Sequence, residues 1–143
     1  MSVIVCSDGV MSADSSINSG DLCLPFPKIW KATFQGAELL CGAVGPLPQV
    51  ALLQQWTLDG LVPKQWPIQA TLAQLLVLSP DKGVVRYRDS SIPYLHGHQK
   101  LAIGEGAPFA YGALFMGATA EQAVAAAIEF SPHCNGSPIS LSL

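Results

Sequence analysis

Short apolar runs separated by turn residues dominate the first 45 positions of the chain. The turns are Ser7-Asp8-Gly9, whose Asp-Gly pair favours a tight hairpin, Ser19-Gly20-Asp21, and Gln35-Gly36. The strands predicted around them are Val3 to Cys6, Val10 to Ala13, Lys28 to Phe34 and Glu38 to Val44. This region therefore predicts a β-meander whose first strand starts next to residue 2.

Helical spacing and further strands follow in the rest of the chain. The predicted helices are Gln49 to Leu58, Phe109 to Met116 and Thr119 to Phe130. Thr119 and Gln122 form a capping-box pattern at the start of the last helix, and Pro132 stops it. The predicted strands are Leu72 to Leu78, Val84 to Tyr87, Leu101 to Ile103 and Ile139 to Leu143. This order predicts one α+β domain over 1–143, with sheets and helices in layers.

Composition narrows the partners and the compartment. The chain of 143 residues is 50% hydrophobic and only 12% charged, about half the usual charged share, which favours an oligomer. A net charge of -3 without a basic cluster argues against nucleic acid and membrane as partners. No apolar run reaches membrane-spanning length and no signal peptide is evident, so we expect a cytoplasmic protein.

The metal-ligating residue types are scattered. Cys6, Cys23, Cys41 and Cys134 contain no C-x-x-C pair, and we expect free thiols in a reducing compartment. His96-Gly97-His98 lacks the further ligands of a zinc site. We therefore expect neither a metal nor a cofactor.

Three groups of segments carry a resemblance to a known family. They are Ser2 to Val5 with Asp8 to Ser15; Lys28-Ile29 with Gly42 to Gly45; and Ala102 to Gly106 with Phe109 to Leu114 and Gly117 to Val124. In this order they resemble the proteasome β-subunit and HslV superfamily of N-terminal-nucleophile hydrolases, in particular its short phage and prophage members. Only Gly60 to Ala70 has no counterpart. The resemblance implies a four-layer αββα sandwich with a shortened second helix.

The same resemblance implies a catalytic set. Ser2 becomes the nucleophile once Met1 is removed, and its free α-amine, with a reference pKa of roughly 7.7–8.0, is the base. Lys28 is the cation beside the nucleophile, Asp14 is its partner, and the Gly45 backbone N–H faces the oxyanion. Because of this role, we expect Lys28→Ala to abolish activity. We also expect Lys28 to be an exposed strand-end residue, so the same substitution should leave the fold intact.

The chain departs from the family pattern in two places. Glu105 stands between two glycines where the family often has serine, and is either a substitute carboxylate or a surface charge. Near the C-terminus Cys134 and Gly136 match the family, but Ser131 occupies the place of an aspartate and Asn135 that of a glycine. Because these positions assist the α-amine, the departures put turnover in question.

Three functions remain open at this point. The leading interpretation is a peptidase that acts on peptides or unfolded proteins as a homo-oligomeric ring, with an ATP-dependent unfoldase as a candidate partner. Its subunit interfaces are expected at the helices Pro46 to Leu58 and Phe109 to Met116. The alternative is a catalytically degenerate subunit with a structural or binding role. A third interpretation keeps the fold and changes the substrate to a small amide.

Overall fold

The first hairpin forms as the sequence predicts. The computed structural model describes residues 2–143, and in it β1 (Ile4–Ser7) pairs antiparallel with β2 (Val10–Ala13). Asp8 and Gly9 both have positive φ, at 53° and 79°, which is the backbone of the two-residue turns that match the twist of a hairpin. The Asp-Gly signal therefore specified both the turn and the register.

The first sheet places β1 in its interior. Its order is β10-β1-β2-β11, with β10 at Leu101–Ile103 and β11 at Ile139–Ser142, and all its pairs are antiparallel. Ile4 pairs with Ala13 on one side and with Ile103 on the other. The amino end of the chain is thus held between an early and a late segment.

The second sheet has five antiparallel strands in chain order. They are β5 (Ile29–Phe34), β6 (Ala37–Val44), β7 (Gln74–Leu78), β8 (Val84–Arg88) and β9 (Tyr94–Gly97). The strand β9 was missed because its residues are mostly exposed and a register shift interrupts its pairing with β8. It contains His96 and Gly97, so this pair lies on an edge strand.

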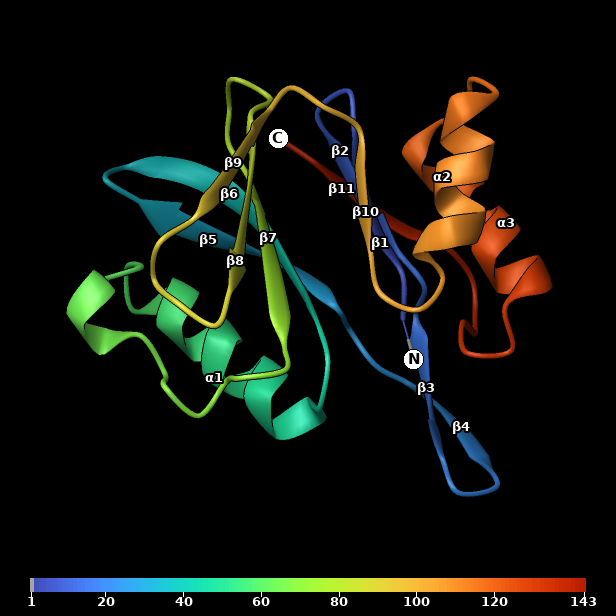
Figure 1. Ribbon diagram of the computed structural model, residues 1–143, viewed down its shortest axis with the longest axis horizontal. Helices are drawn as coiled ribbons and strands as arrows, with labels where there is room; N and C mark the ends of the chain where they lie inside the picture. Colours follow the sequence, from blue (N-terminus) through green and yellow to red (C-terminus); the bar gives the residue numbers. More distant parts are fainter. Residues whose placement is uncertain (1) are drawn as a thin grey trace.

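The prediction of one meander over the first 45 residues is wrong. β3 (Ser16–Ser19) and β4 (Leu22–Pro25) form a separate two-stranded ribbon that extends away from the layers in Figure 1. The turn Ser19-Gly20-Asp21 is correctly placed between them. All four β4 residues are exposed, so no alternation of apolar and polar residues marks the strand. The chain passes through this ribbon on its way from the first sheet to the second.

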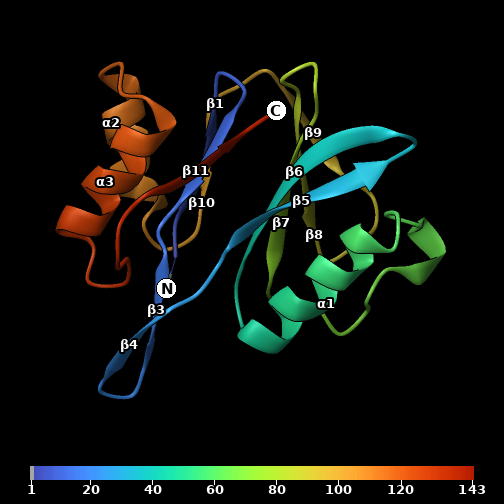
Figure 2. The same cartoon turned by 180° about the vertical axis from the view of Figure 1, so that it is seen from behind.

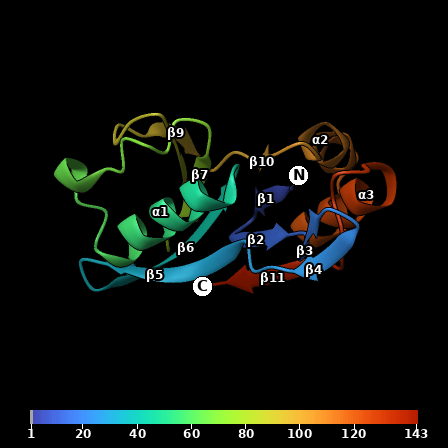
Figure 3. The same ribbon diagram turned by 90° about the horizontal axis from the view of Figure 1, so that it is seen from below.

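Helices cover both outer faces of the stacked sheets. α1 (Leu47–Leu58) and a 3-10 turn (Pro63–Gln65) lie beside the second sheet, while α2 (Ala107–Phe115) and α3 (Ala120–Phe130) cover the first (Figures 2 and 3). One apolar cluster fills the space between the sheets, including Ile4, Met11 and Leu76. Two further apolar clusters lie between the sheets and the helices that cover them. The predicted αββα sandwich is confirmed, and on the α1 side the second helix is reduced to the 3-10 turn.

The helix ends agree with the sequence to within two residues. α3 begins with the predicted capping box, in which the Thr119 hydroxyl accepts from the Gln122 N–H and the Gln122 side chain accepts from the Thr119 N–H. α1 starts two residues earlier than predicted because Pro48 is tolerated in a first helical turn. Within residues 2–143, none of the helices combines the length and the apolar character needed to cross a bilayer.

Candidate active site

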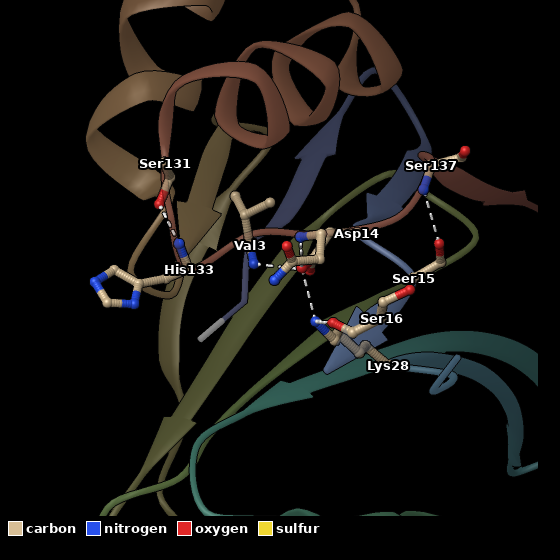
Figure 4. A network of polar contacts seen from close by, with 9 residues as sticks. Val3, Asp14, Ser15, Ser16, Lys28, Ser131, His133 and Ser137 are labelled. Carbon is tan, nitrogen blue, oxygen red and sulfur yellow. Dashed lines mark hydrogen bonds and ion pairs between the residues drawn. The ribbon is translucent and has the colours of Figure 1, made fainter. Parts of the chain in front are cut away.

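A buried ion pair lies where the two sheets and the β3–β4 ribbon meet. The Lys28 Nζ atom is 2.7 Å from Asp14 Oδ2 and also donates to the Ser16 carbonyl at 2.8 Å. Figure 4 shows the Lys28 side chain reaching Asp14 from the start of β5. Asp14 directly follows β2, so the two sheets each contribute one partner.

Asp14 is held by backbone donors as well as by the lysine. Its Oδ1 accepts the Val3 N–H at 3.1 Å, and its Oδ2 accepts the Asn135 N–H, also at 3.1 Å. The Asp14 N–H in turn donates to the Val3 carbonyl at 3.3 Å. The carboxylate therefore ties the residue after Ser2 to the loop that follows α3.

Lys28 is not the exposed strand-end residue that the sequence predicted. Its side chain is 2% exposed and that of Asp14 is 0% exposed. The error arose because Pro27-Lys28 looks like a polar strand entry, whereas β3 and the start of β5 enclose the ammonium. Removing one partner of a buried ion pair commonly costs about 3–5 kcal/mol, so we now expect Lys28→Ala to destabilise the fold instead of leaving it intact.

Ser2, Lys28 and Gly45 line one small cavity. Its volume is about 10 Å³, and Ile17 and Phe26 from the ribbon region complete one side. Ser2 is 8% exposed and lies next to β1. Met1, whose removal would free the Ser2 amine, lies outside the described residues. The geometry thus brings all four predicted catalytic positions together, with Asp14 joined through Lys28.

The backbone at Gly45 requires glycine. Its φ is +132°, and a Cβ atom there would stand 2.7 Å from the Ala73 Cα atom. Both facts exclude a side chain at this position without a backbone shift. Gly45 therefore presents its bare backbone to the cavity that it shares with Ser2.

A glycine-rich turn, 104–106, holds the carbonyl group of Ser2. The Gly106 N–H donates to the Ser2 carbonyl at 3.2 Å. Gly106 also packs against the core, since a Cβ there would come within 2.9 Å of the Val3 Cβ and 2.5 Å of the Cys134 Sγ. Glu105 projects outward from this turn and lies 3.2 Å from His133 Nδ1.

The loop 131–136 closes the site from the other side. Ser131 is buried, and its hydroxyl accepts the His133 N–H at 3.2 Å within the same loop. Cys134 belongs to the apolar cluster under α2 and α3. Its pKa is raised, first by burial and then by the nearby Asp14 charge, so the thiol is neutral and acts as a small core residue.

Comparison with known proteins identifies the architecture. No protein-family model and no curated protein sequence matches the chain. Among solved structures, the BPH protein of Thiobacillus denitrificans in complex with epoxomicin matches with a TM-score of 0.70 and 16% identity, over 99% of this chain and 97% of that one. Eukaryotic HslV from Trypanosoma brucei matches with a TM-score of 0.65 and 16% identity, over 98% and 97%. The chain has the proteasome-like N-terminal-nucleophile hydrolase fold.

A third match extends the comparison. The Anbu complex of Pseudomonas aeruginosa, solved as a helical assembly, matches with a TM-score of 0.64 and 17% identity, over 99% of this chain and 80% of that one. The proteasome-like fold therefore accounts for nearly every residue of the chain. The resemblance drawn from short segments is confirmed at the level of the fold.

At position 135 of the C-terminal loop, the contact with Asp14 does not depend on the side chain. Asn135 acts on Asp14 through its backbone N–H, a group that every residue except proline supplies. Gly136, in contrast, has φ +86°, and a Cβ there would meet the Ser16 Oγ at 2.7 Å. The contact with Asp14 at 135 is thus available to any residue except proline, whereas a side chain at 136 would require its neighbours to shift.

Sequence reasoning missed the backbone groups that hold the ion pair. They are the Val3 and Asn135 N–H groups and the Ser16 carbonyl. No side-chain pattern marks such groups, since any residue type carries them. A hairpin that brings Val3 close to Asp14 was the one available signal, and it covers only the first of the three.

Proposed function

We propose that this protein is a proteasome-like peptidase in which Ser2, exposed by removal of Met1, hydrolyses peptide bonds. The observation that carries the proposal is the buried Lys28–Asp14 pair, in which Asp14 accepts the Val3 N–H and Lys28 lines a cavity together with Ser2 and Gly45. Burying two charges is costly unless they are well paired. A chain that keeps this pair beside its second residue has a site suited to N-terminal-nucleophile chemistry.

The reaction follows the roles of these groups. The neutral Ser2 α-amine takes the hydroxyl proton while Oγ attacks the scissile carbonyl carbon, and the Gly45 N–H donates to the oxyanion. The resulting ammonium then protonates the leaving amine, which leaves an ester on Ser2. Water, activated by the same amine, hydrolyses the ester and restores the hydroxyl. The Lys28 charge stabilises the negative charge on Oγ and favours the neutral form of the amine.

We further propose that the protein works as a homo-oligomer in the cytoplasm on peptides or unfolded proteins, with an ATP-dependent unfoldase as a candidate partner. Large apolar side chains are exposed on the helices of both outer layers: Leu47, Leu52 and Leu58 on α1, and Phe109, Tyr111 and Phe115 on α2. Monomeric proteins rarely leave so much apolar surface uncovered. The helical assembly of the Anbu complex supports an assembled state for this fold.

Hydrolysis of a fluorogenic peptide by the purified chain tests the proposal. The preparation is first weighed by intact mass spectrometry to confirm that its N-terminus is Ser2. Ser2→Ala is expected to abolish turnover, since it removes the nucleophile without a change in charge. Epoxomicin, the molecule bound in the BPH structure, serves as a second probe, with binding read as a rise in Tm. A processed chain that neither turns over peptides nor binds epoxomicin would contradict the proposal.

A second candidate function is a catalytically degenerate subunit, and Ser131 favours it. The Ser131 hydroxyl accepts from the His133 N–H, so the group at the family's aspartate position serves its own loop. Ser131→Asp restores a carboxylate there and can still accept the same N–H. If the processed wild-type chain is inactive and Ser131→Asp gains turnover, the degenerate function is supported for the natural sequence. The matched control is Ser131→Asn, which has the same shape without the charge.

A further inference from the structure

Two polar side chains meet beside the candidate site without belonging to its buried ion pair. His133 Nδ1 lies 3.2 Å from Glu105 Oε2, and the side chains are 52% and 49% exposed. Figure 4 shows the His133 ring directed away from Asp14. An Nδ1–H donates to a carboxylate both in the protonated ring and in the Nδ1–H tautomer, so the contact does not require a charged histidine.

Each partner comes from a loop that already holds part of the site. Glu105 precedes Gly106, whose N–H donates to the Ser2 carbonyl at 3.2 Å. His133 lies two residues before Asn135, whose N–H donates to Asp14 at 3.1 Å. The Glu105–His133 contact therefore joins the turn that holds the nucleophile residue to the loop that holds the carboxylate.

The two loops also touch in the interior. The space beside Gly106 is filled by the Cys134 Sγ atom, which would stand 2.5 Å from a Cβ at position 106. This inner contact is apolar and close, and it lies at one point of each loop. The Glu105–His133 contact supplies a second point at the rim. Two points of attachment restrict how far one loop can rotate against the other.

We propose that Glu105 and His133 form a clasp that positions Ser2 relative to Asp14, in place of the carboxylate that the resembled family carries at position 131. The inference rests on the proposed peptidase function. Both residues act through the loops and are therefore positioning residues. A half-exposed pair adds little to global stability, whereas a small displacement of a nucleophile can lower a rate by up to about 100-fold. We therefore expect loss of the clasp to lower kcat and to leave Tm nearly unchanged.

The test compares four variants, each confirmed by mass to begin at Ser2. Glu105→Ala and His133→Ala remove one side chain each and break the clasp, and the exchange Glu105→His with His133→Glu rebuilds it with its partners reversed. Glu38→Ala is the control, because Glu38 forms an ion pair with Lys31 that is also 3.2 Å long and half exposed but lies on the β5–β6 hairpin. Both single breaks are expected to lower kcat about tenfold or more with KM nearly unchanged. The exchange is expected to recover most of kcat, and the control to change nothing.

Hydrogen exchange of the Gly106 and Asn135 amides gives a readout that does not need turnover. Both amides are expected to exchange faster in the two single breaks and to regain protection in the exchanged pair. The clasp is overturned if the single breaks match Glu38→Ala in exchange and in any measurable kcat, or if the exchanged pair fails to recover. Absence of turnover in the processed wild-type chain would instead contradict the proposed function, and the amide exchange would still decide the clasp.

Discussion

The two sides of the candidate site are built on different physical principles. On the first side, Asp14 and Lys28 are almost wholly buried and are satisfied by each other and by backbone groups. On the second side, the Ser131 hydroxyl accepts a backbone N–H of its own loop, 131–136. The polar contact between this loop and the turn 104–106, Glu105 with His133, is half exposed. Among residues 2–143, the Asn135 Nδ2 atom is one of three buried polar side-chain atoms without a hydrogen-bond partner.

The difference indicates which residues can change. A buried charge that loses its partner is strongly destabilising, so Asp14 and Lys28 constrain each other whatever the activity. The loop contacts depend on backbone groups and on a solvent-accessible pair, so residue identity there is less constrained by folding. Departures from the family pattern fall on this second side, at Glu105, Ser131 and Asn135, where the fold tolerates them.

The sharpest test of this comparison is the removal of Lys28. Lys28→Ala leaves the Asp14 carboxylate buried with backbone donors alone, and is expected to lower the free energy of unfolding by about 3–5 kcal/mol. Lys31→Ala is the control, three residues further along the chain in β5, because Lys31 is 47% exposed in its pair with Glu38 and should cost less than about 1 kcal/mol. Urea unfolding measures both. Equal losses would show that the buried pair is not what distinguishes the two sides.

A smaller effect is expected where the two sides meet, at Gly106. Gly106→Ala puts a methyl group against Cys134, Val3 and Ala127 and is expected to cost about 1–3 kcal/mol through overpacking. Gly112→Ala within α2 is the control, because nothing lies within 4 Å of its added methyl and the helix should gain up to about 1 kcal/mol. Thermal and urea unfolding of the two variants should therefore move in opposite directions.

The mildest probe is thiol alkylation of the native chain, which perturbs neither side. Burial raises the pKa of Cys6 and of Cys41 to about 12 and raises the pKa of Cys134, whereas Cys23 is exposed on the ribbon. A raised pKa lowers the thiolate fraction at a given pH, for Cys6 and Cys41 by about three orders of magnitude from the ordinary value. At pH 8, iodoacetamide followed by peptide mass mapping should modify Cys23 first. Early modification of Cys134 would mean that the loop opens.

Local signals in the sequence predicted most of the fold. The pairs Asp8-Gly9 and Gln35-Gly36 both adopt positive φ at both positions, and Thr119 caps its helix, because each feature depends on residues close in the chain. The ribbon β3–β4 was missed because its second strand is exposed throughout. Periodicity predicts a strand only where one face is buried.

The sequence predicted which residues form the candidate site, but it did not predict how the structure encloses them. Burial of Lys28 depends on Ser16 and Asp14, and the Asn135 contact with Asp14 spans most of the sequence. Such enclosure arises from how distant segments pack, which no local pattern encodes. The resemblance to a family supplied the residues, and only the structure supplied the reason why Lys28 is confined.

The first residues of the chain depend on contacts with segments that are synthesised much later. Ile4 needs Ile103 beside it, and Asp14 needs the backbone of Asn135, so the site can assemble only after residue 135 has been made. Pairing across such separations is intrinsically slow. Throughout translation up to that point, the start of the chain remains an unassembled end. If Ser2 acts as proposed, we therefore expect removal of Met1 to take place at the ribosome, before Ser2 acquires the neighbours of the folded chain.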